Sequence, residues 1–136
     1  MFLVDTNVVS EARKGKKANA GVVAFFQDTD PAALYLSVQT LGEIRRGVEN
    51  IRHRGDALQA TQLENWLDLL GADYADRILG FDGECAQVWG CLMSPHSQHP
   101  IDKQIAAIAL IHNLTVVTRN IGDFASTGVN LKNPFV

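Results

Sequence analysis

Short apolar runs alternate along the chain with longer segments in which apolar and polar residues mix. β-branched residues dominate the run LTVVT, as in a strand that is covered on both faces of a sheet. The first apolar run is closed directly by an acidic residue, Asp5. We predict strands over five short segments: Phe2 to Val4, Leu34 to Ser37, Arg77 to Phe81, Leu114 to Thr118 and Val129 to Leu131.

Between these segments, apolar residues recur at spacings of three and four, which is typical of helices. The clearest stripe follows Val38 and contains Leu41, Ile44, Val48 and Ile51. A second stripe, from Leu63 to Leu70, is expected to end at Gly71 as a C-cap. Further helices are predicted over Val8 to Ala12, over Ala20 to Gln27, after Asp82 as a cap, and over Ile101 to His112. Strands that alternate with helices indicate an α/β fold around a mostly parallel sheet.

Length and composition favour one soluble domain over residues 1–136. The chain is 46% hydrophobic, which is enough for a full core, and no apolar run approaches the ~20 residues of a membrane span. The N-terminus MFLVD has no basic leader, so we expect a cytoplasmic protein. Cys85 and Cys91 fit no metal-binding spacing, and we expect both to be small buried hydrophobic residues.

Two aspartates fall where ligands of α/β proteins usually bind. Asp5 ends the first predicted strand, and Asp123 lies a few residues beyond the LTVVT strand. Ligands bind at the carboxyl ends of the strands in open α/β sheets. Each residue alone also fits a helix cap or a turn, so a shared site requires further carboxylates.

Two helical carboxylates complete such a set. Glu43 lies beside the apolar stripe of its helix, with Gly47 one turn later, and therefore at the edge of the core. Asp102 opens the helix that buries Ile105 and Ala106, at an end where the helix dipole favours an anion. Glutamate exposed to solvent and aspartate as a plain N-cap are the alternatives.

Acidic groups that gather in one place must protonate or recruit cations. Carboxylate oxygens suit Mg²⁺ or Mn²⁺, and such ions can activate water and orient a phosphodiester. The sequence therefore predicts a metal-dependent nuclease in which Asp5, Glu43, Asp102 and Asp123 hold the metal and carry the catalysis.

Three motifs resemble those of PIN-domain ribonucleases, specifically the VapC-type toxins of toxin–antitoxin pairs in VapBC- and FitAB-like systems. The matching segments are FLVDTNVVSE, LGEIRRG and DKQIAAIALIHNLTVVTRNIGDF, and the ending NLKNPF also fits. The resemblance covers the whole chain. It implies a three-layer α/β/α sandwich with a central, mostly parallel sheet of four or five strands.

The resemblance assigns the metal carboxylates to the same four positions, Asp5, Glu43, Asp102 and Asp123. Asn7 and Thr118 stand where the family places polar residues near the site. It also implies a cleaved RNA, a cognate antitoxin and a homodimer that joins the antitoxin in a hetero-oligomer. For the antitoxin we expect a groove walled by the helices over Val38 to Ile51 and Ala20 to Gln27.

Basic residues occur in two clusters although the net charge is −3. We expect the RNA backbone to be held by Arg13, Lys14, Arg45, Arg46 and Arg54, of which Arg45 and Arg46 directly follow the Glu43 segment. Lys103 departs from the small or apolar residue that the family often has after the third acid, and we expect it to face solvent or RNA.

Other functions fit less of the sequence. An aspartyl phosphatase normally has a second Asp two residues after the first, and this position is Asn7. A non-catalytic PIN-like module that binds RNA or a partner would not require all four acids. His96 and His99 have the spacing H-x-x-H but no Glu or Cys nearby, so we interpret them as incidental loop residues.

Overall fold

The computed structural model describes all residues from Met1 to Val136. Its core is one parallel sheet of five strands in the order β3-β2-β1-β4-β5. The strands are β1 (Phe2–Val4), β2 (Leu34–Ser37), β3 (Ile78–Leu79), β4 (Thr115–Val117) and β5 (Leu131–Lys132). The α/β fold with a parallel sheet is confirmed. β1 and β2 match the predicted runs, β3 and β4 lie inside theirs, and β5 shares only Leu131 with the predicted Val129 to Leu131.

The first strand of the chain is also the central strand of the sheet. Phe2 pairs with Leu34 of β2 on one side and with Thr115 of β4 on the other. β3 and β5 then extend the sheet at its two edges. Because all five strands are parallel, their carboxyl ends meet along one edge of the sheet.

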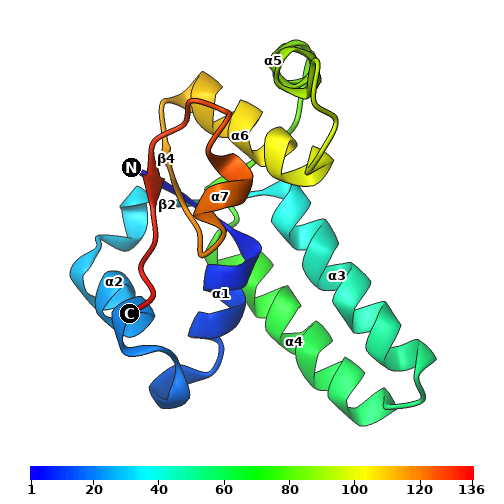
Figure 1. Ribbon diagram of the computed structural model, residues 1–136. Helices are drawn as coiled ribbons and strands as arrows, with labels where there is room; N and C mark the ends of the chain where they lie inside the picture. Colours follow the sequence, from blue (N-terminus) through cyan, green and yellow to red (C-terminus); the bar gives the residue numbers. More distant parts are fainter.

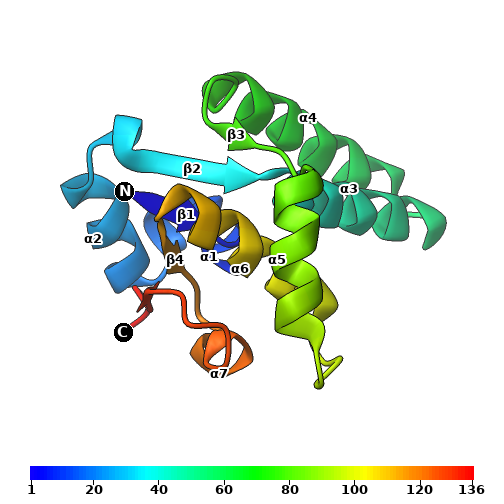
Figure 2. The same ribbon diagram turned by 90° about the horizontal axis from the view of Figure 1, so that it is seen from above.

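Seven α-helices cover the sheet in two layers (Figures 1 and 2). They are α1 (Thr6–Ala12), α2 (Ala20–Asp28), α3 (Val38–His53), α4 (Ala57–Asp73), α5 (Gly83–Met93), α6 (Pro100–His112) and α7 (Ile121–Phe124). Short 3₁₀ turns at Gly15–Lys17 and Pro31–Ala33 flank α2. No helix combines the length and the apolar character that crossing a membrane requires.

The core is divided into two halves by the sheet. Val4 and Val117 face α1, α2, α3 and α4, whereas Leu3 and Val116 face α5, α6 and α7. This alternation is what two-sided burial of a strand requires. α3 and α4 pack together as a long hairpin that extends away from the sheet (Figure 1).

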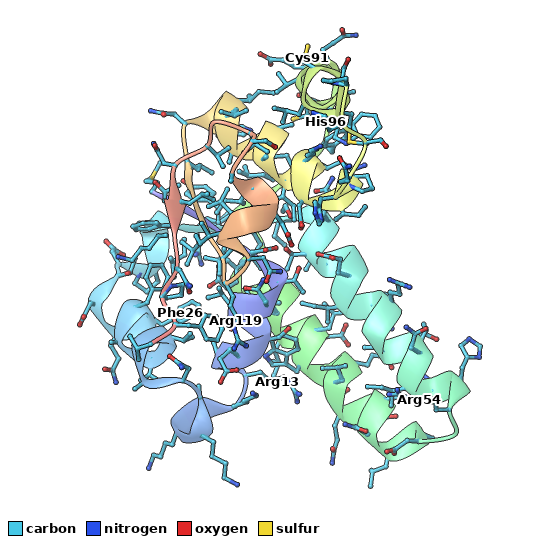
Figure 3. The ribbon with its side chains drawn as sticks, viewed as in Figure 1. Arg13, Phe26, Arg54, Cys91, His96 and Arg119 are labelled. Carbon is cyan, nitrogen blue, oxygen red and sulfur yellow. The ribbon has the colours of Figure 1, made fainter.

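Two sequence-based expectations on this framework were wrong. α4 does not end at Gly71 but continues to Asp73 with Tyr74 as C-cap, and Tyr74 packs against the core. Cys85 is buried as expected, but Cys91 is exposed on α5 (Figure 3). Both thiols are free.

Candidate functional site

Four acidic side chains come from four different elements to the carboxyl edge of the sheet. Asp5 follows β1 and caps α1, Glu43 lies on α3, Asp102 in the first turn of α6 and Asp123 in α7. Their charges interact, because Asp5, Asp123 and Glu43 all act on the carboxyl group of Asp102. The structure therefore brings the four predicted residues into one electrostatically coupled group.

Asp5 is the most deeply held of the four, with 3% of the residue exposed. One carboxylate oxygen, Oδ1, accepts the backbone N–H of Thr6 at 2.8 Å, which is the N-cap bond of α1. The other, Oδ2, accepts the hydroxyl of Thr118 at 2.8 Å and the amide of Asn7 at 3.3 Å. Both Asn7 and Thr118 thus lie beside the acids and fix the orientation of this carboxylate.

Glu43 is oriented by the helix that Asp5 caps. The hydroxyl of Thr6 donates to Glu43 Oε1 at 2.7 Å and lies 3.1 Å from the hydroxyl of Thr40, one turn earlier on α3. Thr40 is buried and is itself bonded to Ser37 at the end of β2. A chain of hydroxyls therefore links the ends of β1 and β2 at the site.

Asp102 and Asp123 form the other half of the group, together with a histidine. Asp102, Asp123 and His99 each offer one ligand atom, and these atoms all lie within 4.8 Å of one another. His99, not Asp102, occupies the cap position of α6 and makes no capping bond. The carboxylate of Asp102 is therefore not the N-cap that sequence reasoning had allowed.

Burial and crowding make the carboxyl groups of Asp5 and Asp102 hard to ionise. The pKa of Asp102 rises to about 6, first because of burial and then because of the neighbouring charges of Asp5, Asp123 and Glu43. Burial also raises the pKa of Asp5, although the hydrogen bond from Thr118 opposes this effect. A divalent cation would offset the repulsion, and an all-oxygen donor set fits a hard ion such as Mg²⁺ or Mn²⁺.

The chain was compared with known protein families, curated proteins and solved structures. Residues 2–129 match the family model described as "PIN domain". This chain belongs to the PIN-domain family.

Curated relatives match this PIN domain over almost its whole length. It is 33% identical to the plasmid stability protein StbB of Pseudomonas syringae pv. tomato and 34% identical to the toxin FitB of Neisseria gonorrhoeae, each over 99% of both chains. It is 31% identical to the VapC ribonuclease Y4jK of Sinorhizobium fredii, over 99% of this chain and 98% of the relative. Among solved structures, FitAcB from Neisseria gonorrhoeae matches with a TM-score of 0.86 and 34% identity, over 98% of each chain.

Lys103 differs from the expectation for this PIN domain. It does not face solvent: 3% of the residue is exposed, and its ammonium donates to the backbone carbonyl of His96 at 2.6 Å. The bond reaches back to the loop between α5 and α6, because a lysine stem on the buried side of α6 can extend along the helix to that loop. Lys103 therefore holds the loop that precedes α6 and Asp102.

The predicted basic residues separate into different groups. Arg46 lines a groove of about 320 Å³ together with Gln39, Gly42, Glu43 and Ile101. Arg45, in contrast, is paired with Glu49 and Glu64 of the α3–α4 hairpin. Arg54 ends α3 at the tip of the hairpin, so the expectation that it lies near the acids was wrong (Figure 3).

Directly after α1, two further basic residues are also engaged. Arg13 stacks over Trp66, and Lys14 pairs with Glu11 at 2.8 Å. Sequence reasoning overlooked Thr6 and the role of His99 at this site. The available signals were the position of Thr6 between Asp5 and Asn7, and the spacing of His99 and Asp102, which is one helical turn.

Proposed function

We propose that this PIN domain is a Mg²⁺- or Mn²⁺-dependent endoribonuclease that acts as the toxin of a toxin–antitoxin pair. The observation that carries the proposal is the convergence of Asp5, Glu43, Asp102 and Asp123 at one edge of the sheet, with a raised pKa at Asp102. Such a group is unfavourable without a cation. The name of the Sinorhizobium relative, VapC ribonuclease, supports RNA as the substrate.

The residues of the site have three roles, which are to bind the metal, to orient its ligands and to contact the RNA. The four carboxylates would hold the divalent ion or ions, and the hydroxyls of Thr118 and Thr6 orient Asp5 and Glu43. A bound divalent cation supplies Lewis acidity to water and to the phosphodiester and neutralises developing negative charge. Arg46 lines the groove beside Glu43, where it would contact the RNA backbone.

Replacement of Asp5 tests the catalytic part of the proposal. Asparagine at this position remains a good N-cap, and the Thr118 hydroxyl can accept from its amide, so Asp5→Asn should fold normally. We expect RNA cleavage to fall by orders of magnitude, and to cease for wild type in excess EDTA. Asp68→Asn, on the exposed face of α4, is the matched control and should remain fully active. Full activity of Asp5→Asn, or of wild type in EDTA, would contradict the proposal.

The substrate is an RNA that is cut at few sites, because a small domain reads sequence through surface loops and unstacked bases. Sequencing of RNA 5′ ends after induced expression should give a short list of sites that are absent with Asp5→Asn. Cleavage of double-stranded DNA without cleavage of RNA would contradict this assignment.

The partner part of the proposal rests on relatives and on a concave surface. FitAB bound to a DNA fragment has been solved, and its matching chain has a TM-score of 0.83 and 32% identity to this one. An open apolar groove of about 430 Å³ is lined by Ala12, Gly15, Lys16, Val22, Val23, Phe26 and Gln27. The walls of this groove are α2 on one side and, on the other, the end of α1 with the 3₁₀ turn after it, whereas the sequence had suggested α2 and α3 as the walls.

We place an amphipathic segment of a cognate antitoxin in this groove. The groove lies at the C-terminal end of α1, whereas Asp5 lies at the N-terminal end of the same helix. The two ends of a helix of this length are about 10 Å apart. Three or four extended residues span that distance, so an arginine of the same segment can reach the acids and pair with a carboxylate.

Growth and co-purification test the partner. Expression of this chain alone should arrest growth, co-expression with an adjacent small gene should relieve it, and both proteins should purify as a hetero-oligomer. Phe26→Glu should reduce co-purification without reducing RNA cleavage. Sedimentation of the purified chain should give a homodimer. Harmless expression, identical to that of Asp5→Asn, would contradict the toxin assignment.

A further inference from the structure

The ring of His99 lies between two of the four acids. Its Nε2 is 3.5 Å from Asp123 Oδ1, and its Nδ1 is 4.0 Å from Asp102 Oδ2. The side chain is 48% exposed, so the ring also meets the solvent from which a cation arrives. A group of one imidazole and two carboxylates differs in chemistry from a site of carboxylates alone.

The backbone before and after His99 is held by hydrogen bonds from side chains. The ammonium of Lys103 holds the carbonyl of His96 at 2.6 Å, and the indole N–H of Trp89 donates to the carbonyl of Pro100 at 3.0 Å. Pro100 restricts the first turn of α6 directly after His99. Figure 3 shows His96 on this connection between α5 and α6. The ring position is therefore set by side chains of α5 and α6 that do not themselves touch the acids.

The spacing of the three ligand atoms suits a single ion. Ligand atoms around a six-coordinate cation with bonds of roughly 2.1 Å are separated by about 3 Å when adjacent and about 4.2 Å when opposite. The separations between these three ligand atoms, which are up to 4.8 Å, would need to shorten only slightly. Magnesium seldom takes nitrogen ligands, whereas imidazole suits first-row transition metals.

We propose that His99 is a fifth protein ligand, which binds the cation held by Asp102 and Asp123 and makes this site select Mn²⁺ over Mg²⁺. The inference rests on the metal site in the proposed function. It adds an imidazole nitrogen to what would otherwise be a set of oxygen donors.

Electron paramagnetic resonance of the protein with Mn²⁺ alone provides a test independent of RNA cleavage. We expect spin-echo modulation from a directly bound ¹⁴N nucleus in wild type, which changes when histidine is labelled with ¹⁵N. His99→Ala should lose this modulation and bind Mn²⁺ about 10-fold or more weakly, while Mg²⁺ affinity, measured by competition, changes less than about 3-fold. His96→Ala is the matched control, because only the backbone carbonyl of His96 is used.

The possible failures are distinguishable. If Mn²⁺ binds to wild type without nitrogen modulation, and His99→Ala binds it equally well, His99 is not a ligand although the acidic metal site stands. If wild type binds no Mn²⁺, the metal site of the proposed function itself is wrong. Because the wild-type signal decides the first case alone, the test does not depend on the folding of a variant.

Discussion

The carboxyl group of Asp102 responds to pH differently from an ordinary surface aspartate. Its pKa rises from 3.8 to about 6, because the group is buried beside other acids. Between these two values the folded protein binds more protons than the unfolded chain. The stability that this group contributes is therefore complete at low pH and is lost as the pH rises through about 6.

Asp102→Asn should remove this pH dependence. In EDTA, the Tm of the variant should equal that of wild type near pH 4 and exceed it by roughly 4 °C at pH 7, which corresponds to about 1 kcal/mol in a domain of this size. Thermal unfolding at several pH values measures the difference, with Asp68→Asn as control. A constant difference across this range would show that Asp102 titrates normally.

In wild type, Mn²⁺ affinity should also rise as the pH passes 6, because the ionised form is the ligand.

Thr118 should affect the site through its hydrogen bond to Asp5. Its hydroxyl donates to Asp5 Oδ2 at 2.8 Å, and Thr118→Val keeps the shape of the side chain but removes this bond. Loss of a group that orients a metal ligand commonly lowers metal affinity or activity by roughly 10- to 100-fold, and we expect a decrease in this range. Thr115→Val, at the start of the strand that Thr118 follows and without such a bond, should behave like wild type in Mn²⁺ titration and RNA cleavage.

The acids could be identified from the sequence, whereas their neighbours could not. Asp5 stands out because it directly ends an apolar run, and Glu43 because it borders an apolar stripe. The position of His99 depends on a left-handed backbone at φ 55° and on the bond from Lys103, neither of which follows from residue spacing. The same bond explains why Lys103 is buried despite its charge.

Among the helices, α2 depends on a close approach to the C-terminal segment. A Cβ atom on Gly21 would lie 2.0 Å from the carbonyl oxygen of Pro134, which real structures do not allow. Asn19 strengthens the same contact by accepting the backbone N–H of Val136 at 3.1 Å. Only glycine fits between α2 and this segment.

Gly21→Ala should therefore be destabilising, by roughly 1–3 kcal/mol, because the backbone of residues 133–136 must move. Gly90→Ala is the matched control: it lies in the interior of α5 with open space around it, and should stabilise by roughly 0.5–1 kcal/mol. Chemical denaturation of both variants measures the two signs. Equal effects would show that the contact with Pro134 is not tight.

On α3, consecutive arginines should behave differently towards RNA. Arg46 faces the groove beside Glu43, whereas Arg45 and Arg52 are held by Glu49 and Glu64 between α3 and α4. Arg46→Gln should weaken RNA binding and lower the salt slope by about 1, and Arg45→Gln should leave the slope unchanged. Fluorescence titrations of catalytically inactive Asp5→Asn at several salt concentrations measure both. A larger loss of RNA affinity for Arg45→Gln than for Arg46→Gln would show that Arg45, and not Arg46, contacts the RNA.

The limits of helix prediction are visible at α4. Gly71 favours a helix end, but burial of Leu70 and the packing of Tyr74 against the core continue the helix past it. The cost of a glycine inside a helix is about 1 kcal/mol, which tertiary packing readily exceeds. Periodicity therefore located the helices, and contacts between them set their ends.

For the molecule as a whole, the apolar pattern predicts the layers but not the order of the strands. Val116 and Val117 point to opposite halves of the core, and this alternation requires helices on both faces of the sheet. Nothing in the pattern indicates that β1 lies between β2 and β4. That order is a property of the complete chain, because it pairs residues near positions 2, 34 and 115.

The central position of β1 has a consequence during translation. A nascent chain that already contains Asp5 and Glu43 still lacks β4, α6 and α7, so it has neither the second partner of β1 nor the other two acids. At about 5–20 residues per second, the ribosome needs roughly 4 to 16 s to add the 80 residues between Glu43 and Asp123. If the proposed toxin function is correct, a polypeptide that stops early should therefore be harmless to the cell that makes it, and toxicity should begin only when synthesis is almost complete.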